Sequence, residues 1–417
     1  MLEGLERVDW SRLTHPYGDG DACDIPDLLR ELASDDADAR SDALQMLSCR
    51  VCDSPIETMT AVVPFLVELA AHPAVEERGE ILGFLAQIAG DDSDDPPQDP
   101  EDEMHARRWE EAHAWSAAAR EAVETGLPVF LNLLADEDIG VQVAAAWVLA
   151  RCRGQASRLI LELIDRIRSH AVPRVQAALI LALEPLARPL AQPEAVVPFL
   201  AEQMRSEAPP VVRLAAALSL ARLSPGRPSP EIVETLCETS EAAWKEFEES
   251  TGRATGACVG QVLEEDPQAW LRFLLRPLDN PDPYIRKNAR WSAAQLGFRF
   301  RSMTRAVASA LGKRFVGVEV EDRREIAEIL AGYGAAAAEA LDSLIQGAAD
   351  DDPQVRIASA LALAGLHDPR ALSVLIDRLE GYRIRGESTA WPRIVSGDLF
   401  FRVAEDLADY GSAARPA

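Results

Sequence analysis

Apolar residues recur at helical spacing along most of this chain, and residues 350–366, DDDPQVRIASALALAGL, show the pattern most clearly. Asp352 followed by Pro353 is typical of a helix start, where a capping side chain precedes a proline in the first turn. The apolar residues that then fall on one helical face are Val355, Ala358, Leu361, Ala362 and Gly365. The segment therefore predicts a helix that begins beside Asp352 and buries one side.

Internal repetition is visible as an identical hexapeptide. AVVPFL occurs at 61–66 and again at 195–200, and LPVFL at 127–131 is a looser copy. Because proline is tolerated near a helix start or at a kink, each copy is expected to mark such a place. The 134 residues between the two hexapeptides fit four repeats of about 34 residues, within the range of paired-helix arrays.

An Arg or Gln that follows an apolar residue marks the second helix of the repeating unit. These signature positions are Arg40, Gln142, Gln176, Arg213, Arg286 and Arg356. Helices at 24–33 and 36–51 are predicted for the first pair. Weaker units are expected at 229–263 and 301–333, the latter with RREIAEILAGYG as its second helix. The spacing indicates roughly eight to ten helix pairs.

The Asp-Pro, Val-Arg, small-apolar pattern resembles the second helix of a HEAT repeat, over about residues 24–380. The resemblance, to HEAT-like and PBS-lyase-type repeat proteins of bacterial type, implies an all-α fold, a right-handed α-solenoid of the HEAT/armadillo kind. Members of this class generally act as protein-binding scaffolds with a concave face lined by second helices. A non-enzymatic protein–protein interaction scaffold that binds its partner on this concave face is therefore the expected function.

The expected domain organisation follows from where the repeat pattern holds and where it breaks. It comprises an N-terminal cap at 1–23, HEAT-like repeats at 24–90, an acidic disordered loop at 91–106, further repeats at 107–380, and a C-terminal cap and tail at 381–417. Residues 91–103, DDSDDPPQDPEDE, hold eight carboxylates and no basic residue, so they cannot bury enough apolar surface to fold alone. They are either a spacer or a segment that folds onto a basic partner surface.

Composition limits the partner and the compartment. A 417-residue chain exceeds the size of a single core, and its net charge of −27 disfavours nucleic acid and anionic membranes as partners. Its three lysines among 42 basic residues indicate a GC-rich bacterial genome. No secretory pattern opens the sequence and no apolar stretch is long enough for a spanning helix. Six unevenly spaced cysteines are typical of reduced thiols, so a cytoplasmic location is expected.

A local reversal of charge is the strongest functional signal. Residues 283–318 contain eight basic and no acidic residues, with aromatic residues such as Tyr284, Phe298 and Phe315 between them. Cations beside aromatic faces suit an acidic or phosphate-bearing partner. The predicted partner-binding residues are Arg286, Arg290, Trp291, Arg299, Arg301 and Arg305. The alternative interpretation is that Arg286 pairs with Asp282 or Asp279, that the aromatic residues are core, and that the rest is a solvated face.

Signals for metal or catalytic chemistry are weak. Cys49 and Cys52 form a CxxC pair that could meet Cys23, His15 or His72, but a structural zinc site needs four ligands, so packing is the preferred interpretation. No His is followed by Glu, unlike the HEAT-built di-iron hydroxylases, and no GxSxG, Walker A or dinucleotide loop is present. No catalytic residue, cofactor or metal is therefore predicted, and an enzyme is not favoured.

Two alternative functions remain open on the sequence. HEAT-like alkylpurine DNA glycosylases line a basic groove with Trp and Asp, and Trp291 among the arginines of 283–318 resembles that arrangement, which implies a nucleic-acid-binding protein or a glycosylase-like enzyme. An immunity protein whose acidic surface neutralises a basic bacterial toxin is the other. The phycobilisome lyases are also HEAT-like, but no specific motif here matches them.

Overall fold

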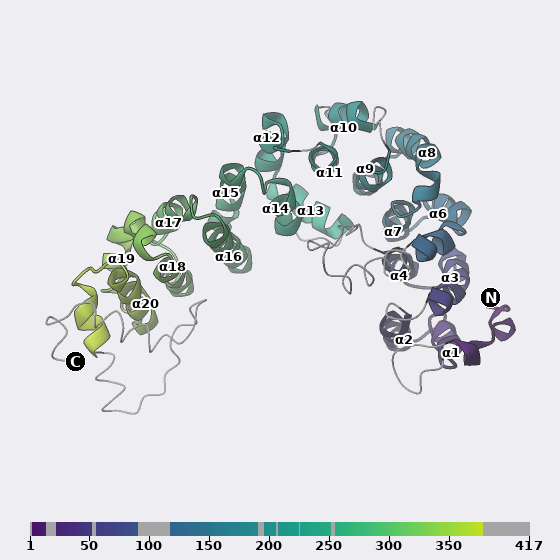
Figure 1. The fold of residues 1–417 in the computed structure, drawn as a ribbon, viewed down its shortest axis with the longest axis horizontal. Coiled ribbons are helices and arrows are strands. Elements are labelled where there is room, and N and C mark those ends of the chain that lie inside the picture. The colour runs from purple at the N-terminus through teal and green to yellow at the C-terminus, as the bar shows by residue number, and fades with distance from the viewer. Residues whose placement is uncertain are drawn as a thin grey trace, which may run out of the picture. The chain divides into compact units, whose positions relative to one another are not determined.

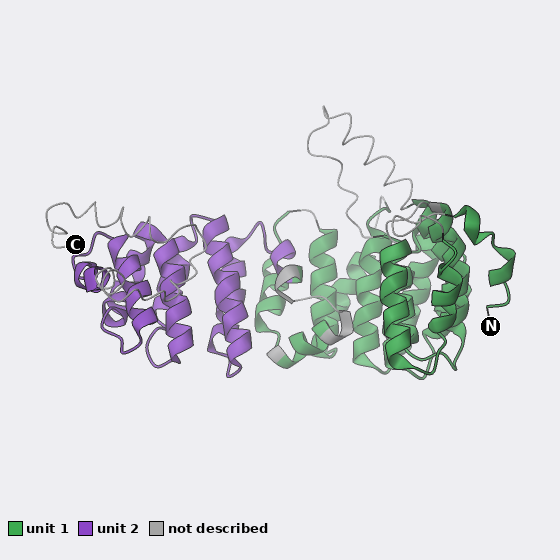
Figure 2. Cartoon of the chain, turned by 90° about the horizontal axis from the view of Figure 1, so that it is seen from below, with its two compact units in different colours: residues 1–258 green, residues 259–417 purple. Residues whose placement is uncertain are grey.

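The computed structural model describes residues 2–13, 22–51, 56–90, 117–190, 196–205, 207–224, 226–251 and 255–377. Within these ranges the regular structure is helical, as predicted for an α-solenoid (Figure 1). Two compact units, residues 1–258 and 259–417, are coloured separately in Figure 2. The predicted acidic loop at 91–106 and the predicted C-terminal cap at 381–417 lie outside the described residues.

Unit 1 consists of helix pairs in which the second helices pack side by side. Its first helices are α1 (Ile25–Glu31), α3 (Ile56–Ala71), α6 (Leu127–Leu133), α8 (Ala156–Ser169) and α10 (Val196–Arg205). Its second helices are α2 (Ala37–Val51), α4 (Arg78–Ile88), α7 (Ile139–Leu149), α9 (Pro173–Ala187) and α11 (Pro210–Leu223). Contacts run from α2 to α4, α4 to α7, α7 to α9 and α9 to α11. The helices predicted at 24–33 and 36–51 are confirmed as α1 and α2.

The predicted pair at 229–263 is wrong in detail, because three short helices occupy it: α12 (Pro230–Glu238), α13 (Glu241–Thr251) and α14 (Thr255–Val262). Ser229 caps α12 by accepting from the Ile232 amide at 3.4 Å. Helix α13 packs against α9 and α11, on the inner side of the second-helix row of unit 1 (Figure 1). Burial of Trp244 and Phe247, 7% and 1% exposed, explains why this acidic helix leaves the regular pattern.

The prolines of the repeated hexapeptide do not all mark helix starts. Pro128 lies in the first turn of α6, as predicted, but Pro64 lies inside α3, which begins at Ile56. An internal proline removes one helical hydrogen bond. The neighbouring Val63 and Leu66 are fully buried, and this apolar burial offsets that loss.

Unit 2 continues the same arrangement. Its helices are α15 (Pro267–Leu275), α16 (Pro283–Arg299), α17 (Thr304–Gly312), α18 (Val320–Gly332), α19 (Leu341–Gly347) and α20 (Pro353–Ala364), with α16 against α18 and α18 against α20. The predicted weak unit at 301–333 is confirmed as α17 and α18. Asp352 caps α20 by accepting from the amides of Gln354 and Val355 at 2.9 and 3.0 Å.

Helix α20 is buried on more sides than its pattern predicts. Ile357, Ser359 and Leu363 are buried together with the predicted stripe, except that Gly365 at its end is only half-buried. Contacts with α18, α19 and the η5 turn (Gly334–Ala340) account for the wider burial. A helix with small and apolar residues on several faces is typical of a position enclosed by neighbours.

The signature residues tie each second helix to the turn before it. The side-chain nitrogens of Arg40, Gln142, Gln176, Arg286 and Arg356 each donate to a backbone carbonyl six residues earlier, at 2.9, 2.5, 2.9, 3.0 and 2.7 Å. Arg213 differs from the other five, because it donates to the Met204 carbonyl, nine residues earlier, at 3.2 Å. Carbonyls at the turn would otherwise lack a partner. The recurring Arg or Gln is therefore a structural element of the repeat.

Ion pairs join adjacent repeats as well. Arg78 on α4 makes two hydrogen bonds of 2.7 and 2.9 Å to Asp136, which lies in the turn before α7. Both side chains are largely buried, at 12% and 15% exposure. Arg323 on α18 reaches Asp350, before α20, at 2.7 Å. The Arg78 guanidinium lowers the pKa of Asp136 below its ordinary value of 3.8.

At the N-terminus, two short 3-10 turns, Leu5–Arg7 and Trp10–Arg12, lie against α3. The Trp10 and Phe65 ring centroids are 6.1 Å apart, and the Leu2 amide donates to Glu68 at 2.7 Å. This packing covers the side of α3 with apolar surface. Among the described residues, no helix is both long and apolar enough to cross a membrane.

The Arg78–Asp136 pair gives unit 1 a pH-dependent contribution to stability. Since the folded-state pKa of Asp136 is lowered, the contribution is fully present above the unfolded value of 3.8 and is lost as the pH falls through the folded value. We expect Asp136→Asn to lower the unfolding free energy at pH 7, and the difference from the wild type to shrink below pH 3.8 in urea titrations. Asp165→Asn is the control, because it removes an ion pair with Arg168 in which Asp165 is 81% exposed. This variant should change the unfolding free energy little, both at pH 7 and at low pH. A difference for Asp136→Asn that is constant with pH would contradict the assignment.

Candidate functional site

Helix α16 presents an exposed aromatic face. Asp282 begins the helix by accepting from the Tyr284 amide at 2.8 Å. Tyr284, Trp291 and Phe298 follow at intervals of seven residues, close to two helical turns, so they share one side of the helix. They are 71%, 40% and 37% exposed, while Ala289, Ala293 and Leu296 on the opposite side are buried. We call these three side chains the aromatic face.

The alignment of these side chains sets the aromatic face apart. Of the seven large apolar side chains that are exposed in the described part of the chain, three are on α16. The other four are scattered singly: Met46, Ile139, Leu161 and Val316. Single exposed apolar residues are normal on a protein surface, whereas contiguous ones mark interaction sites. The aromatic face is therefore the leading candidate surface in unit 2.

Phe298 is held in place at one end of the aromatic face. Its ring meets Tyr333 edge-on with centroids 5.0 Å apart, and the Tyr333 hydroxyl donates to the Ala294 carbonyl at 3.1 Å. A Cβ added at Gly332 would lie 2.9 Å from the Phe298 ring, so glycine permits this approach. Burial raises the pKa of Tyr333, which keeps its hydroxyl protonated as a donor. Phe298 is thus fixed before any partner binds.

Two of the six predicted partner-binding residues serve the fold. Arg290 is only 3% exposed, and its Nη2 lies 2.9 Å from Asp322 and 2.6 Å from Glu325 on α18. Arg286 donates to the same Asp322 at 2.7 Å. The structure therefore places Arg290 away from any surface open to a partner. The alternative pairing of Arg286 with Asp279 or Asp282 is also wrong, because the acid it meets is on the next repeat.

Asp279 and Asp282 have other roles. Asp282 caps α16, and Asp279 accepts from Arg314 at 2.7 Å, a hydrogen bond that lowers the Asp279 pKa. Arg299 pairs with Glu264 and lies over the Phe300 ring, 5.5 Å from its centroid. The acidic partners of Arg299 and Arg314 therefore lie outside 283–318.

Most of the charge that made 283–318 look basic is neutralised by neighbouring segments. Lys287 lies 3.4 Å from Glu325. With the four arginine pairs above, five of the eight cations of 283–318 therefore face carboxylates from outside it. Burial raises the pKa of the nearby Glu328, which Arg324 partly opposes. The surface around α16 is mixed in charge, which the sequence segment alone did not indicate.

The remaining predicted residues lie on different surfaces. Arg301 is exposed in the turn after α16, and Arg305 is exposed on α17, a first helix. Within the described ranges neither makes an ion pair. Trp291 is the one predicted residue on the aromatic face, and Tyr284 and Phe298 were not among the predicted residues. Their seven-residue spacing around Trp291 was the available signal.

The candidate metal pair cannot be followed in full, because Cys52 and His15 lie outside the described residues. Cys23 and Cys49 are both exposed. In the parts of the chain that the structure covers, no group of three or more His, Cys, Asp or Glu side chains could hold a metal ion.

Comparison with known proteins agrees with the fold. The family model for HEAT repeats matches residues 127–221 and 310–389. A solved structure of importin beta is similar over 94% of this chain and 54% of that chain, with 13% identity and a TM-score of 0.53. A Kap95p structure with RanGDP matches 88% of this chain and 48% of that chain, with 14% identity and a TM-score of 0.49. The chain spans about half the length of these structures. No curated protein sequence matches significantly.

The family-model match, the similarity to importin beta and the paired helices define the class: an α-solenoid of stacked helix pairs. HEAT repeats are present at 127–221 and 310–389, as the sequence pattern predicted. This fold is typical of protein-interaction scaffolds.

Substitutions of Arg290 and Lys287 can distinguish a buried structural cation from an exposed one on the same helix. We expect Arg290→Met to lower the unfolding free energy by about 3 kcal/mol, because Asp322, itself 3% exposed, and Glu325 lose a buried partner. Lys287→Met removes a half-exposed cation from the same Glu325, and should cost less than about 1 kcal/mol. Chemical denaturation of both variants measures the difference. Equal losses would show that Arg290 is not the buried tie between α16 and α18.

Proposed function

We propose that this chain is a non-enzymatic interaction scaffold that binds a protein partner on the second-helix face of unit 2. The observation that carries the proposal is the aromatic face of Tyr284, Trp291 and Phe298 along α16. Tyr and Trp are the residues most enriched at the energetic centres of protein interfaces. Phe298 also packs against Tyr333, but Tyr284 and Trp291, 71% and 40% exposed, keep much of their apolar surface open to a partner.

The surroundings of the aromatic face favour an amphipathic partner segment. Arg301, which makes no ion pair within the described residues, is exposed just beyond the C-terminal end of the aromatic face. A partner segment with apolar residues in line and an acidic residue at one end would match the aromatic face and Arg301. Amphipathic helices that bind protein surfaces present apolar residues that include this seven-residue spacing.

The nucleic-acid alternative receives less support. Binding to phosphates depends on several accessible cations, and five of the eight in 283–318 already face carboxylates. The chain also carries a net charge of −27. We therefore favour a protein partner over a nucleic acid.

We place this activity in the cytoplasm. Cys152 and Cys258 are buried free thiols. Burial, with a smaller contribution from Glu124, raises the pKa of Cys152 to about 12, so it stays an unreactive thiol. Free buried cysteines fit a reducing compartment.

Site-specific crosslinking tests the proposal. A photo-reactive amino acid at Asn288, which is exposed between Tyr284 and Trp291, should crosslink a protein in cells of the native host. The same group at Leu161, 60% exposed on α8, is the matched control and should not capture that protein. The partner so identified is then titrated against purified wild type and variants.

We expect Trp291→Ala to weaken that partner's affinity about tenfold or more, as loss of an interface anchor does, with Tm unchanged within a few degrees. Leu161→Ala should leave the affinity unchanged. Retention of full affinity in both Trp291→Ala and Tyr284→Ala would refute the aromatic face as the binding surface.

A further inference from the structure

Two neighbouring first helices of unit 2, α15 and α17, contain basic residues and no acidic residue (Figure 1). Arg272 is exposed on α15, Arg305 is exposed on α17, and Lys313 is exposed directly after α17. Arg301 is exposed in the turn that leads into α17. We call these four side chains the outer patch.

Contacts at both ends hold the α15 and α17 segments together. Trp270 on α15 meets Phe300, just before α17, edge-on, with ring centroids 6.2 Å apart. At the other end, Arg314 makes two hydrogen bonds of 2.7 Å to Asp279. Along both segments the members of the outer patch lie between these two contacts. Their backbone positions are therefore fixed next to one another before any partner binds.

The cations of the outer patch have no local counter-charge. Within the described residues none of the four makes an ion pair. Between 267 and 318 the acidic residues are Asp279, which accepts from Arg314, and Asp282, which caps α16. Glu265, exposed before α15, and Glu339, exposed on η5 beside α17, border the outer patch but pair with none of its members. Its positive charge thus remains open to a partner.

The size of the outer patch favours a short acidic protein segment over a nucleic acid. At about 0.15 M salt, charges are screened beyond about 8 Å, so a short segment is attracted by the outer patch and is little affected by the rest of the surface. A long polyanion would extend beyond the outer patch and meet the other charges of a chain whose net charge is −27. Arginine can also hold a carboxylate through two parallel hydrogen bonds.

We propose that the outer patch binds a short acidic segment of a protein, whose carboxylates lie against Arg272, Arg305 and Lys313. The outer patch is on first helices, whereas the aromatic face is on the second helix α16. The inference therefore does not rest on the proposed function, and either can fail without the other.

Fluorescence anisotropy of rhodamine-labelled hexaglutamate measures this binding on the full chain. The peptide should bind at about 0.05 M salt and more weakly at about 0.3 M, because added salt screens the charges of the outer patch. Hexaglutamine with the same label is the matched neutral probe and should not bind.

Charge reversal in the outer patch tests where the peptide binds. The triple variant Arg272→Glu, Arg305→Glu, Lys313→Glu should weaken hexaglutamate binding about tenfold or more, since three attractive contacts become repulsive. Arg301 is kept, because it also borders the aromatic face. The corresponding triple substitution by Gln removes the same charges without adding repulsion, and should weaken binding by a smaller factor.

A control variant separates the outer patch from the overall charge of the chain. Arg7→Glu, Arg12→Glu, Arg158→Glu reverses three exposed arginines of unit 1 and changes the net charge by the same amount. It should bind hexaglutamate within about twofold of the wild type, because charges beyond the screening length contribute little. Thermal melts followed by circular dichroism confirm that each variant is folded.

Three results would overturn the proposal: no hexaglutamate binding by the wild type at low salt, undiminished binding by the folded outer-patch variants, or an equal loss in the unit 1 control. A single-stranded oligonucleotide of about 20 nucleotides serves as the competing probe. If it binds more tightly than hexaglutamate and is lost in the same outer-patch variants, the surface recognises nucleic acid and the acidic-protein assignment is refuted.

Discussion

Burial of apolar residues between neighbouring helix pairs is the interaction on which the rest of this structure depends. On α9, Val175, Leu179 and Leu183 are completely buried, and the contacts that cover α9 come from α7, α8, α11 and α13. No pair has a core of its own that is large enough to be stable alone, so each relies on the next. Within each helix pair, the signature Arg or Gln donates a hydrogen bond to the turn that precedes the second helix. Ion pairs such as Arg78–Asp136 connect a second helix to the turn of the next helix pair.

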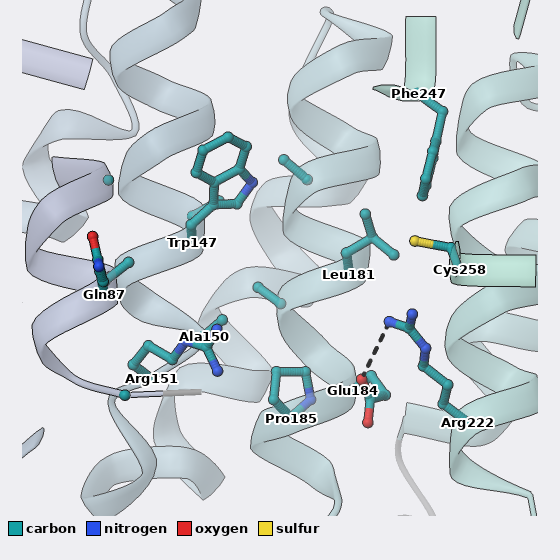
Figure 3. A pocket seen from close by; sticks show the side chains of 16 residues that line it. Gln87, Trp147, Ala150, Arg151, Leu181, Glu184, Pro185, Arg222, Phe247 and Cys258 are labelled. Atoms are coloured by element: carbon teal, nitrogen blue, oxygen red, sulfur yellow. Dashed lines mark ion pairs between the residues drawn. The ribbon is translucent and has the colours of Figure 1, made fainter. Parts of the chain in front are cut away.

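Packing between neighbouring helix pairs does not determine which residues occupy the positions of a second helix that face away from those neighbours. The two units carry side chains of opposite size at such positions. In unit 2, large aromatic residues on α16 project outward as an exposed face. In unit 1, glycine and alanine on α4, α7 and α9 leave a hollow, which Phe247 of α13 borders on another side (Figure 3). An exposed aromatic face and a hollow can therefore arise on second helices without any change in how the repeats of each unit stack.

The fold could be predicted from the sequence because its determinants are local and recur. The hexapeptide repeat and the signature positions such as Gln142 and Arg356 follow from helix periodicity and from turn hydrogen bonds within six residues. Where the pattern weakened, at 229–263, the prediction of a helix pair was wrong. Helix α13 there is positioned by contacts with α9 and α11, which no local pattern encodes.

The site was harder to predict, because the partners of its charges lie one repeat away. Arg286 meets Asp322 at a separation of 36 residues, and Arg290 meets Glu325 at a separation of 35. A search for acidic residues one repeat length from each arginine would have found both pairs. The hollow in unit 1 gave no such signal, since it is formed by small residues on three different helices, α4, α7 and α9.

Hydrogen exchange measured by mass spectrometry on Leu179→Ala tests the nearest-neighbour account most directly. Leu179 is fully buried on α9, and its truncation leaves a cavity that weakens packing there. The account predicts faster amide exchange in α7, α9 and α11, with α18 and α20 exchanging as in the wild type. Uniformly faster exchange across both units, or acceleration in α18 and α20 alone, would contradict it.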